Sequence, residues 1–585
     1  MFKKTDIDQS RHFGWVAAII LLSILACIQV NSALHETATS DEAVHLSAGM
    51  SYWATGDYRM NPEHPPLVKF IAALPPLIAG VHIPLDDPSW ATADKWRFGT
   101  VFLYENIFKP ETILLMGRSA VILMSVGFGV LIYAWTRRRF GVLPALLMLA
   151  LYVFDPMVQA NGHYITTDLA AMFTLAVVAG LLLRYVESPS RCRLWVFAIG
   201  LAIAQNTKYS MVILWVAVLV VLLFFHLKER RGNPSIRIWN LRRIAGALGI
   251  CLVSFAAVTF IVYGFEVKRP INDPVVKQLY IKRAEFINSP EYEKLLPTDK
   301  KYLGYFDLDT ATGRGIERLL NTVPIPAYSY ISGAFAVAGH NYTGHTHSLL
   351  NQVSVAGAWF YWPVAWSAKT PAGILILTLI GAALAIRRKL YRRTMVQVFG
   401  LIAIVYLISA MLSNITIGLR HLMPIFPMFY GLAAYAVVSG LRARAWIWKA
   451  SVLMLLGAGL FLPLRNVQHP IIYYSELIGG TRNGYLFVLD SNLDWGQSAG
   501  EASKYVRSHG TILTGASLAM TDDLGYYGFP STPVPTSEVV TKNGIAPGWY
   551  LISINALYGE QNYDWLKSRT PDRVFGNALY LYRVN

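Results

Sequence analysis

The sequence predicts a mainly α-helical membrane protein that crosses the bilayer about eleven times and carries a small extracytoplasmic α/β domain at its C-terminal end. Three observations predict this fold class. The 585 residues are 54% hydrophobic and only 15% charged, unlike an ordinary soluble domain. Apolar runs long enough to cross a membrane recur over residues 1–463. Residues 464–585 change to short runs typical of strands alternating with helices.

The apolar runs define the candidate membrane spans. An α-helix needs about 20 mostly apolar residues to cross a hydrocarbon layer of about 30 Å. We therefore expect residues 1–463 to form a transmembrane domain. The candidate spans are 14–34, 112–135, 141–158, 165–186, 193–207, 209–227, 244–265, 363–386, 394–413, 419–440 and 445–463.

The basic residues predict the orientation of these spans. The net charge of +16 is concentrated in short clusters between apolar runs, including Arg137-Arg138-Arg139 and residues 228–243, 387–393 and 442–444. One orientation places all of these clusters in the cytoplasm, as the positive-inside rule requires. The basicity therefore indicates topology and not nucleic-acid binding. The sequence predicts a multi-pass protein of the plasma (inner) membrane, and a functional site, if present, is expected on the extracytoplasmic, periplasmic side, where the long polar segments lie.

Three long segments fall on the outer side: residues 35–111, residues 266–362 and the C-terminal part. The first contains "HPPLVKFIAALPPLIAGVHIPL", which is apolar, broken by prolines and too short to span. We expect a helix lying in the membrane interface over residues 67–85. In the second segment, residues 273–296 are charged and typical of a helix. We expect the first span to remain as an anchor, because no convincing signal-peptide cleavage site follows it.

The C-terminal part predicts a small α/β domain over residues 464–585. "GYLFVLD", "TILTGASLAM" and "GWYLISI" are typical of buried strands, and "SAGEASKYVRSHG" and "ALYGEQNYDWLKSR" of helices. Asp490, in "DSNLDWGQ", would then end a strand, where ligands often bind in open α/β folds. The alternative is a turn in which Asp490 makes local backbone hydrogen bonds. An acceptor-binding role for this segment is a hypothesis.

Two adjacent carboxylates follow the first span in "TSDEAVHLSAG". Asp41 and His45 are four residues apart and share one face of a helix, beside Glu42. Helix capping by Thr39 or Ser40 would also favour acids in this first turn. The polar residues near other outer helix ends favour a catalytic interpretation of Asp41 and Glu42.

Further polar residues lie beside predicted outer helix ends. "EHPPLVK" adds His64 and Lys69 next to the interfacial helix, Asp168 begins a span, and Lys208 lies between two spans. An ionisable group within a membrane span is costly and is a functional candidate. Asp168 could instead be an ordinary acid of a first helical turn, and Lys208 could extend to the membrane surface.

Arg420 and His421 lie at the outer end of another span, in "RHLMPIFP". No carboxylate lies beside them in the sequence. The planar guanidinium group suits a phosphate, which makes Arg420 a candidate for substrate binding, with His421 beside it. The headgroup of a membrane lipid is the alternative partner.

The motifs "DEAVHLSAG", "EHPPLVK", "TTDLA" and "RHLMPIFP" resemble landmarks of the C-type superfamily (GT-C) of membrane glycosyltransferases, in the family order. The resemblance is to the branch of protein O-mannosyltransferases and lipid A aminoarabinose transferases. It implies the GT-C fold, a polyprenyl-phosphate-linked sugar donor, a hydroxyl acceptor and a pocket at the outer membrane face. The C-terminal part does not match the sugar-binding domains of eukaryotic protein mannosyltransferases, so protein, glycolipid and polysaccharide acceptors stay open.

The resemblance also implies roles for single residues. Asp41 matches the catalytic carboxylate and Glu42 its neighbour, and Asp168 matches a second acid. Lys69, Lys208 and Arg420 match basic groups near the donor phosphate, and His64 lies in the "HPP" turn. The chemistry suits these residue types, because a carboxylate can take the proton of the acceptor hydroxyl and cations can stabilise the departing phosphate.

No cofactor is expected to be required. Several acids and histidines are of the types that bind metals, but their spacing is not diagnostic. Related oligosaccharide transferases use a divalent ion, so a metal remains conceivable and we assign no metal ligand. The residues in question are Asp41, Glu42, His45, His64, His340, His345 and His347.

Two other function classes compete with a glycosyltransferase. A transporter or flippase for a lipid-linked substrate would place ionisable groups near the middle of broken spans and often shows repeated halves. The charges in this sequence gather at outer helix ends, and we find no internal repeat. A structural scaffold would explain the C-terminal part but not the convergence of acidic and basic residues. The expected partners are the polyprenyl-phosphate sugar donor, membrane lipids and a hydroxyl acceptor, without nucleic acid.

Overall fold

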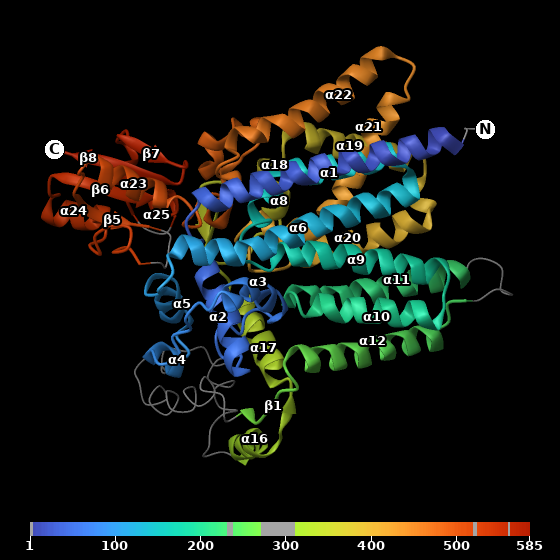
Figure 1. The fold of residues 1–585 in the computed structure, drawn as a ribbon, viewed down its shortest axis with the longest axis horizontal. Coiled ribbons are helices and arrows are strands. Elements are labelled where there is room, and N and C mark those ends of the chain that lie inside the picture. The colour runs from blue at the N-terminus through green and yellow to red at the C-terminus, as the bar shows by residue number, and fades with distance from the viewer. Residues whose placement is uncertain (1–3, 231–237, 271–310, 519–522, 560–561) are drawn as a thin grey trace.

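The computed structural model describes residues 4–230, 238–270, 311–518, 523–559 and 562–585. Long helices lie side by side, with the C-terminal sheet at one end of the bundle and the N-terminus at the other (Figure 1). The charged helix predicted at residues 273–296 falls outside the described residues. The mainly α-helical fold class is confirmed.

Each of the eleven predicted apolar runs forms a helix, and in the described part of the chain eight helices are long and apolar enough to cross a membrane. Together they make the chain a multi-pass membrane protein. The eight spans are built on α1 (Lys4–His35), α6 (Pro110–Phe140), α9 (Asp168–Glu187), α11 (Ile213–Arg230), α12 (Leu241–Val262), α20 (Thr394–Met411), α21 (Phe426–Leu441) and α22 (Trp446–Phe461).

The other three apolar runs form shorter helices. Helix α7 (Val142–Phe154) has 13 residues, which reach only about 20 Å. It ends at Asp155, whose side chain accepts a hydrogen bond of 2.8 Å from the Met157 backbone N–H and caps the short helix α8 (Pro156–Asn161). The run at 363–386 is divided by Pro371 into α18 (Tyr361–Lys369) and α19 (Ala372–Arg387). The third is α10 (Arg191–Gln205).

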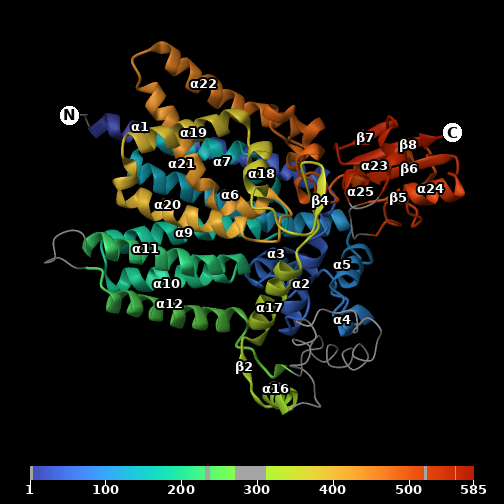
Figure 2. The same cartoon turned by 180° about the vertical axis from the view of Figure 1, so that it is seen from behind.

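Small residues let several of these helices approach closely. Helix α19 packs on both α21 and α22. A Cβ atom at Gly373 would overlap the Leu455 carbonyl oxygen, and one at Gly381 would overlap the Leu432 carbonyl oxygen. Such small residues at helix contacts are typical of membrane bundles, where close packing drives association. Figure 2 shows these helices on the face opposite to that of Figure 1.

The first outer segment folds into four short helices beside the ends of the spans: α2 (Glu42–Thr55), α3 (Leu67–Ile78), α4 (Pro88–Thr92) and α5 (Lys95–Tyr104). Helix α2 packs between α3 and α5. Helix α3 is the predicted interfacial helix, although it ends at residue 78 and not at 85. It buries Val68 and Ala72 and exposes Leu74 and Ile78, which is the amphipathic pattern of a helix lying on a membrane.

The second outer segment is described in part. Strand β1 (Val267–Lys268) pairs antiparallel with β2 (Ile325–Pro326), and β3 (His347–Leu349) with β4 (Gln352–Ser354). The helices of this segment are α16 (Ala311–Thr322) and α17 (Tyr328–Thr343), and α17 lies beside α2 and α3 in both views (Figures 1 and 2).

The C-terminal part contains a four-stranded sheet in the order β5-β6-β8-β7. β5 (Leu513–Ser517) and β6 (Gly548–Ser553) are parallel, and β8 (Leu579–Val584) is antiparallel to β6 and to β7 (Arg573–Phe575). The helices are α23 (Ala499–Ser508), α24 (Ser537–Asn543), α25 (Ile554–Tyr558) and α26 (Asp564–Lys567). The small α/β unit predicted from the sequence is therefore present.

The predicted strand "GYLFVLD" is wrong. Residues Thr481–Leu486 form a 3-10 helix, and only Val488 makes a single antiparallel bridge, to Leu349. Two glycines with positive φ, Gly479 and Gly480, turn the backbone just before this segment. Asp490 consequently does not end a strand. It begins the 3-10 helix Asp490–Asn492 and has a φ of 63°.

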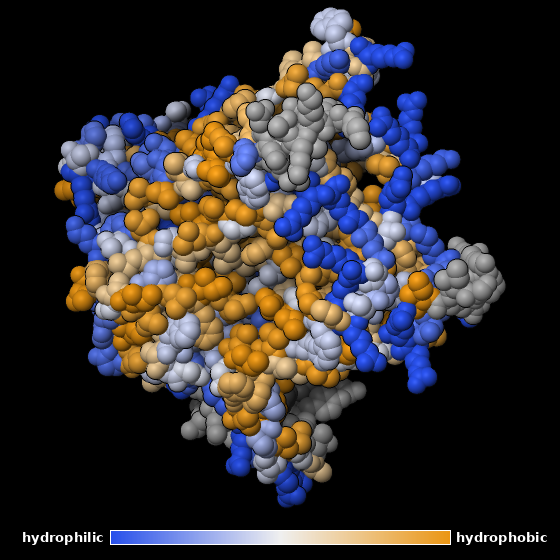
Figure 3. All heavy atoms as spheres, turned by 45° about the vertical axis from the view of Figure 1, so that its right-hand side comes forward, coloured by the Kyte–Doolittle hydropathy of each residue, from blue (hydrophilic) through white to orange (hydrophobic). Residues whose placement is uncertain are grey.

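The surface has the pattern of a membrane protein. Figure 3 shows hydrophobic side chains across the middle of the helical surface and hydrophilic side chains on both sides of it. The exposed apolar residues on the spans include Leu252 and Val253 on α12 and Ile404 and Ile408 on α20. The basic residues at 137–139 and in the last turn of α11 lie at the end of the bundle opposite to the C-terminal sheet (Figure 1).

Candidate functional site

The centre of the candidate site is the guanidinium group of Arg420. Arg420 lies in the 3-10 helix Leu419–Ile425, which leads into α21. Its Nη1 atom lies 3.4 Å from Asp41 Oδ2 and 3.4 Å from Asp168 Oδ2. The fold therefore brings together three predicted site residues that are up to 379 positions apart in the chain. Arg420, which has no carboxylate beside it in the sequence, has two in the structure.

Asp41 is the most accessible member of this cluster. Its side chain is 26% exposed, compared with 9% for Arg420 and 2% for Asp168. Asp41 precedes the first residue of α2, yet its carboxylate makes no capping hydrogen bond to the helix. The alternative named Thr39 or Ser40 as the helix cap, but the cap position is Asp41 itself, and the acid in the first turn is Glu42. A second molecule approaching the cluster would meet this carboxylate first.

Lys208 supplies a second cation. Its Nζ atom lies 2.6 Å from Asp168 Oδ1, and both side chains are buried. Lys208 is thus held inside the protein by Asp168 and does not extend to the membrane surface. Asp168 binds Lys208 with one carboxylate oxygen and Arg420 with the other. In this way it fixes two positive groups next to each other.

Glu42 has a different environment from its neighbour Asp41. It is completely buried, and its carboxylate accepts hydrogen bonds of 2.8 and 2.6 Å from Arg118. The backbone N–H groups of Thr39 and Ile165 donate to it as well, at 2.9 and 3.1 Å. Burial raises the pKa of Glu42, but the charge and hydrogen bonds of Arg118 outweigh burial and lower it below 4.5. Both oxygens of Glu42 are occupied, so it holds the loop and is not in position to take a proton.

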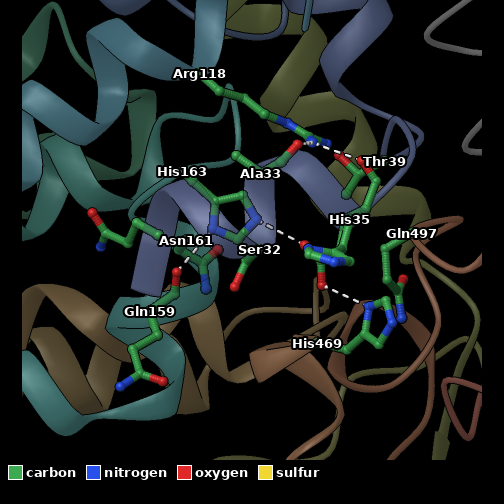
Figure 4. Close-up of polar contacts among 12 residues, drawn as sticks. Ser32, Ala33, His35, Thr39, Arg118, Gln159, Asn161, His163, His469 and Gln497 are labelled. Atoms are coloured by element: carbon green, nitrogen blue, oxygen red, sulfur yellow. Dashed lines mark hydrogen bonds and ion pairs between the residues drawn. The ribbon is translucent and has the colours of Figure 1, made fainter. Parts of the chain in front are cut away.

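Arg118 is a site-supporting residue that sequence reasoning missed. It lies in the first third of the span built on α6, and besides Glu42 its guanidinium group donates to the backbone carbonyls of Ala33, Glu36 and Thr37 at 2.8–2.9 Å. These contacts fix the loop between α1 and α2, which carries Asp41 (Figure 4). An arginine within an apolar run was the available signal in the sequence, because such residues are rare in spans unless they have a role.

Lys69 and His64 belong to a polar group that is separate from the cluster around Arg420. The Lys69 Nζ atom donates to the backbone carbonyls of Asn61 and His64, at 2.6 and 2.8 Å, and to the Tyr52 hydroxyl. Burial lowers the pKa of Lys69 well below its usual range. Lys69 thus faces the loop at residues 61–64 and not the carboxylates of the central cluster. Its contact with a donor phosphate stays a prediction.

His45 and His64 lie edge to face, with ring centroids 5.0 Å apart. His45 Nδ1 lies 2.8 Å from the Ile165 carbonyl oxygen, and burial, only partly opposed by the charge of Asp41, lowers the pKa of His45 to about 4. Burial and the neighbouring His45 also lower the pKa of His64. Both rings are therefore neutral at physiological pH. His421 stacks on Trp362 at a centroid distance of 6.4 Å.

The segment "DSNLDWGQ", residues 490–497, also contributes to the site. The Ser491 Oγ atom accepts a hydrogen bond of 3.2 Å from Arg420 Nε, and the Trp495 ring lies 3.9 Å from the Arg420 guanidinium carbon. The Trp495 carbonyl accepts a hydrogen bond from the backbone N–H of Ser40, directly before Asp41. The sequence pointed to this segment because of the expected position of Asp490 at the end of a strand. The contacts with Arg420, however, come from Ser491 and Trp495. No sequence pattern links them to Arg420.

A buried carboxylate ties the same loop to the C-terminal part. Glu36 lies 2.7 Å from His163 Nε2 and 3.2 Å from His469 Nδ1, so the two histidines approach it from different elements (Figure 4). His469 Nε2 lies 3.7 Å from Glu501 on α23. Burial raises the pKa of Glu36, but the hydrogen bonds and charges of His163 and His469 outweigh burial and lower it to about 2. Glu36 therefore stays ionised and links α1, the segment after α8 and α23.

Among the described residues, no three histidine, cysteine, aspartate or glutamate side chains are arranged to hold a metal ion. His340 and His345 lie 3.0 Å apart, between Nε2 and Nδ1, on the second outer segment, and His345 is 3.8 Å from Asp490. We assign no metal ligand to these residues or to the cluster around Arg420.

Comparisons with known proteins bear on this site. Residues 113–258 match the sequence model described as dolichyl-phosphate-mannose-protein mannosyltransferase, and this stretch includes Asp168 and Lys208. No curated protein matches the chain. Among solved structures, ArnT from Cupriavidus metallidurans bound to undecaprenyl phosphate is 14% identical, with a TM-score of 0.45 over 97% of this chain and 98% of ArnT.

A second structure of ArnT from Cupriavidus metallidurans, in the apo state, is 14% identical, with a TM-score of 0.43 over 98% of each chain. An oligosaccharyltransferase from Archaeoglobus fulgidus, tethered to an acceptor peptide, is 12% identical, with a TM-score of 0.43 over 77% of this chain and 55% of that chain. The family match supports a membrane glycosyltransferase. The chain is a multi-pass membrane protein that resembles the dolichyl-phosphate-mannose-protein mannosyltransferases over residues 113–258.

Proposed function

We propose that this chain is a membrane glycosyltransferase that transfers a sugar from a polyprenyl-phosphate-linked donor to a hydroxyl acceptor. One observation carries the proposal: the Arg420 guanidinium lies between the carboxylates of Asp41 and Asp168, next to Lys208, at the end of the helix bundle. This arrangement combines an accessible carboxylate with two fixed cations. The family match over residues 113–258 supports the same class of donor.

In the proposed reaction Asp41 is the general base. Its carboxylate takes the proton of the acceptor hydroxyl as the hydroxyl oxygen forms a bond to the anomeric carbon of the sugar. The bond between that carbon and the phosphate oxygen breaks, and its electron pair leaves with the polyprenyl phosphate. The phosphate needs no proton to depart, because it is already acidic, so one base is enough. The partial exposure of Asp41 lets the acceptor reach it.

Arg420 and Lys208 stabilise the departing phosphate. The phosphate gains one negative charge as the sugar leaves, so cations fixed beforehand stabilise the transition state more than the ground state. Asp168 holds both cations in place through its two oxygens. A donor phosphate that takes the place of Asp41 at Arg420 Nη1 also releases the Asp41 carboxylate to act as a base.

The other predicted residues have supporting roles in this proposal. Glu42 fixes the loop of Asp41 through Arg118, and Lys69 fixes residues 61–64, which carry His64. His421 follows Arg420 and packs on Trp362. We assign the donor contacts to Arg420 and Lys208 and the support to Glu42, His64, Lys69 and His421. The proposed step uses no metal and no other cofactor.

We place the reaction at the extracytoplasmic face of the plasma (inner) membrane. The site lies at the end of the bundle that carries α2, α3 and the C-terminal sheet, and the basic loops lie at the opposite end (Figure 1). By the positive-inside rule the basic loops face the cytoplasm. A polyprenyl chain in the bilayer would then present its phosphate at the level of α3. We divide the chain into a catalytic transmembrane domain, residues 1–463, and a C-terminal domain, residues 464–585.

The proposal is tested by incubating the purified protein with a panel of radiolabelled polyprenyl-phosphate sugars and a mixture of envelope acceptors. We expect one donor to lose its label to an acceptor or to water. A panel in which every donor stays intact would contradict the proposal. The same donors in sealed vesicles test the flippase alternative, which predicts movement of an unchanged labelled lipid across the bilayer.

A further inference from the structure

Residues 490–497 contact both of the chain segments that carry Asp41 and Arg420. On one side, the backbone N–H groups of Thr37 and Ser40 donate to the carbonyls of Gln497 and Trp495, at 3.1 and 3.0 Å. On the other side, the backbone N–H of Leu419 donates to Asn492 Oδ1 at 2.9 Å. The segment therefore contacts the chain directly before Asp41 and directly before Arg420.

The contacts with Arg420 itself are specific. The guanidinium carbon lies 3.9 Å from the centroid of the Trp495 ring, and Arg420 Nε donates to Ser491 Oγ. Ser491 in turn donates to the Ile417 carbonyl at 2.6 Å, so its oxygen is aimed at Nε. A Cβ atom at Gly418 would lie 2.6 Å from this oxygen, which leaves room only for glycine beside Ser491.

Residues 490–497 are also held by hydrogen bonds to residues other than Arg420. The Lys369 Nζ atom donates to the Asn492 carbonyl at 2.6 Å, and the Asn492 side chain donates to the Tyr361 hydroxyl at 2.9 Å. Asn555, at the start of α25, donates to the Asp494 carbonyl at 2.7 Å. Ser491, Asn492 and Trp495 are all buried. The segment thus has contacts with both the helix bundle and the C-terminal sheet.

We propose that Trp495 and Ser491 are positioning residues for the transfer reaction, because they lock the Arg420 guanidinium in the orientation that points Nη1 at Asp41 and Asp168. This inference rests on the proposed function. An arginine has many side-chain rotamers, and an aromatic face on one side with an acceptor at Nε selects one of them. A cation oriented before the reaction stabilises developing phosphate charge without reorganising in the transition state.

The inference also gives the C-terminal domain a role. Residues 490–497 of this domain complete the environment of Arg420, and they are supported by Asn555 on α25 and by Ser553 at the end of β6, which donates to Asp494. A domain that only bound an acceptor would not need to contact Arg420. We infer that residues 490–497 belong to the catalytic centre, although they lie in the C-terminal domain by position.

The test compares two substitutions of Trp495 in the purified full-length protein. Trp495→Phe keeps an aromatic face for the guanidinium, and Trp495→Leu keeps an apolar side chain without one. We expect Trp495→Phe to retain kcat within about threefold and Trp495→Leu to lose about tenfold or more, because a buried cation–π contact is lost. The KM for the acceptor should stay unchanged in both. Trp549→Leu, which removes a cation–π contact with Arg583 in the sheet, is the matched control.

Two results would overturn the inference: wild-type kcat in Trp495→Leu, or an equal loss of kcat in Trp495→Phe and Trp495→Leu. If Trp495→Leu does not fold, Ser491→Ala decides. It removes the acceptor at Arg420 Nε and should lower kcat about tenfold. Ser498→Ala is its control, since no described residue hydrogen-bonds with the Ser498 hydroxyl. Wild-type kcat in Ser491→Ala would contradict the inference.

Failure of this inference and failure of the proposed function give different results. The wild type and Asp41→Asn are assayed on the same donor panel. If the wild type transfers label and Asp41→Asn does not, the proposed function stands and the Trp495 variants decide the inference alone. If the wild type itself leaves every donor intact, the proposed function fails first.

Discussion

Adjacent acids at the start of α2 have opposite environments. Asp41 is partly exposed beside Arg420, whereas Glu42 is buried against Arg118. The sequence predicted that both acids belong to the site, and the resemblance favoured Asp41 as the base. It could not show that Glu42 is enclosed, because its partner Arg118 lies 76 positions away on another helix. Only the packing of α6 against the loop before α2 separates the two carboxylates.

We predict that Glu42→Gln lowers stability, whereas Asp41→Asn does not. Removing one partner of a buried ion pair leaves Arg118 uncompensated and costs about 3–5 kcal/mol. Asp41 is partly exposed, and its substitution leaves Arg420 paired with Asp168. Thermal unfolding of the two variants in the same detergent measures the difference. Equal apparent melting temperatures for Glu42→Gln and the wild type would refute the supporting role of Glu42.

At the scale of elements, the buried Glu36 carboxylate connects the loop after α1 with α23. Burial lowers the pKa of His469, but its hydrogen bond to Glu36 and the charges of Glu36 and Glu501 outweigh burial and raise it to about 9. The folded protein therefore binds the proton of His469 more tightly than the unfolded chain does. The stabilisation is complete below pH 6.5, the usual pKa, and is lost as the pH rises through 9.

We predict that the stability advantage of the wild type over His469→Asn decreases as the pH rises. Near pH 6.5 the difference in unfolding free energy should be about 1.5–3 kcal/mol, typical of hydrogen bonds to a charged group. It should shrink as the pH passes 9. Thermal unfolding across this range measures it, with the exposed His509→Asn as the control. A difference that grows with pH would contradict the assignment.

The elements themselves could be predicted to different extents. All eleven apolar runs form helices, since an apolar run of this length has few alternatives in a membrane protein. Helix α7 is shorter than its run because Asp155 and Pro156 end it, and the apolar composition hides that break. The strand expected at 484–490 is absent, because the contacts of these residues with β3 and α25 decide their conformation.

For the whole molecule, the predicted site was a set of residues at one end of the bundle. The structure brings Asp41, Asp168, Lys208 and Arg420 together, as the resemblance implied. Lys69 lies apart from them, because its contacts are two loop carbonyls and the Tyr52 hydroxyl on α2. Trp495 could not have been assigned, since nothing in the sequence relates residue 495 to the 3-10 helix of Arg420.

The orientation of the molecule can be tested with its own cysteines. Cys192 is exposed in the first turn of α10, between Arg191 and Arg193, and Thr541 is exposed on α24 in the C-terminal part. We predict that a membrane-impermeant maleimide labels Thr541→Cys in intact cells and labels Cys192 only after the membrane is opened. Thr541→Cys in a Cys192→Ser background is the control. Labelling of Cys192 in intact cells would contradict the predicted orientation and place the basic loops on the outer side.

The central claim is that Asp41 is the base of a sugar transfer from polyprenyl phosphate. The most direct measurement is the turnover of purified Asp41→Asn on the donor that the wild type uses, beside Asp57→Asn, whose carboxylate pairs with Arg59 away from the cluster. We predict that Asp41→Asn lowers kcat by about 10²–10⁴, the usual contribution of a general base, while Asp57→Asn retains it. Near-normal turnover by a folded Asp41→Asn protein would contradict the account.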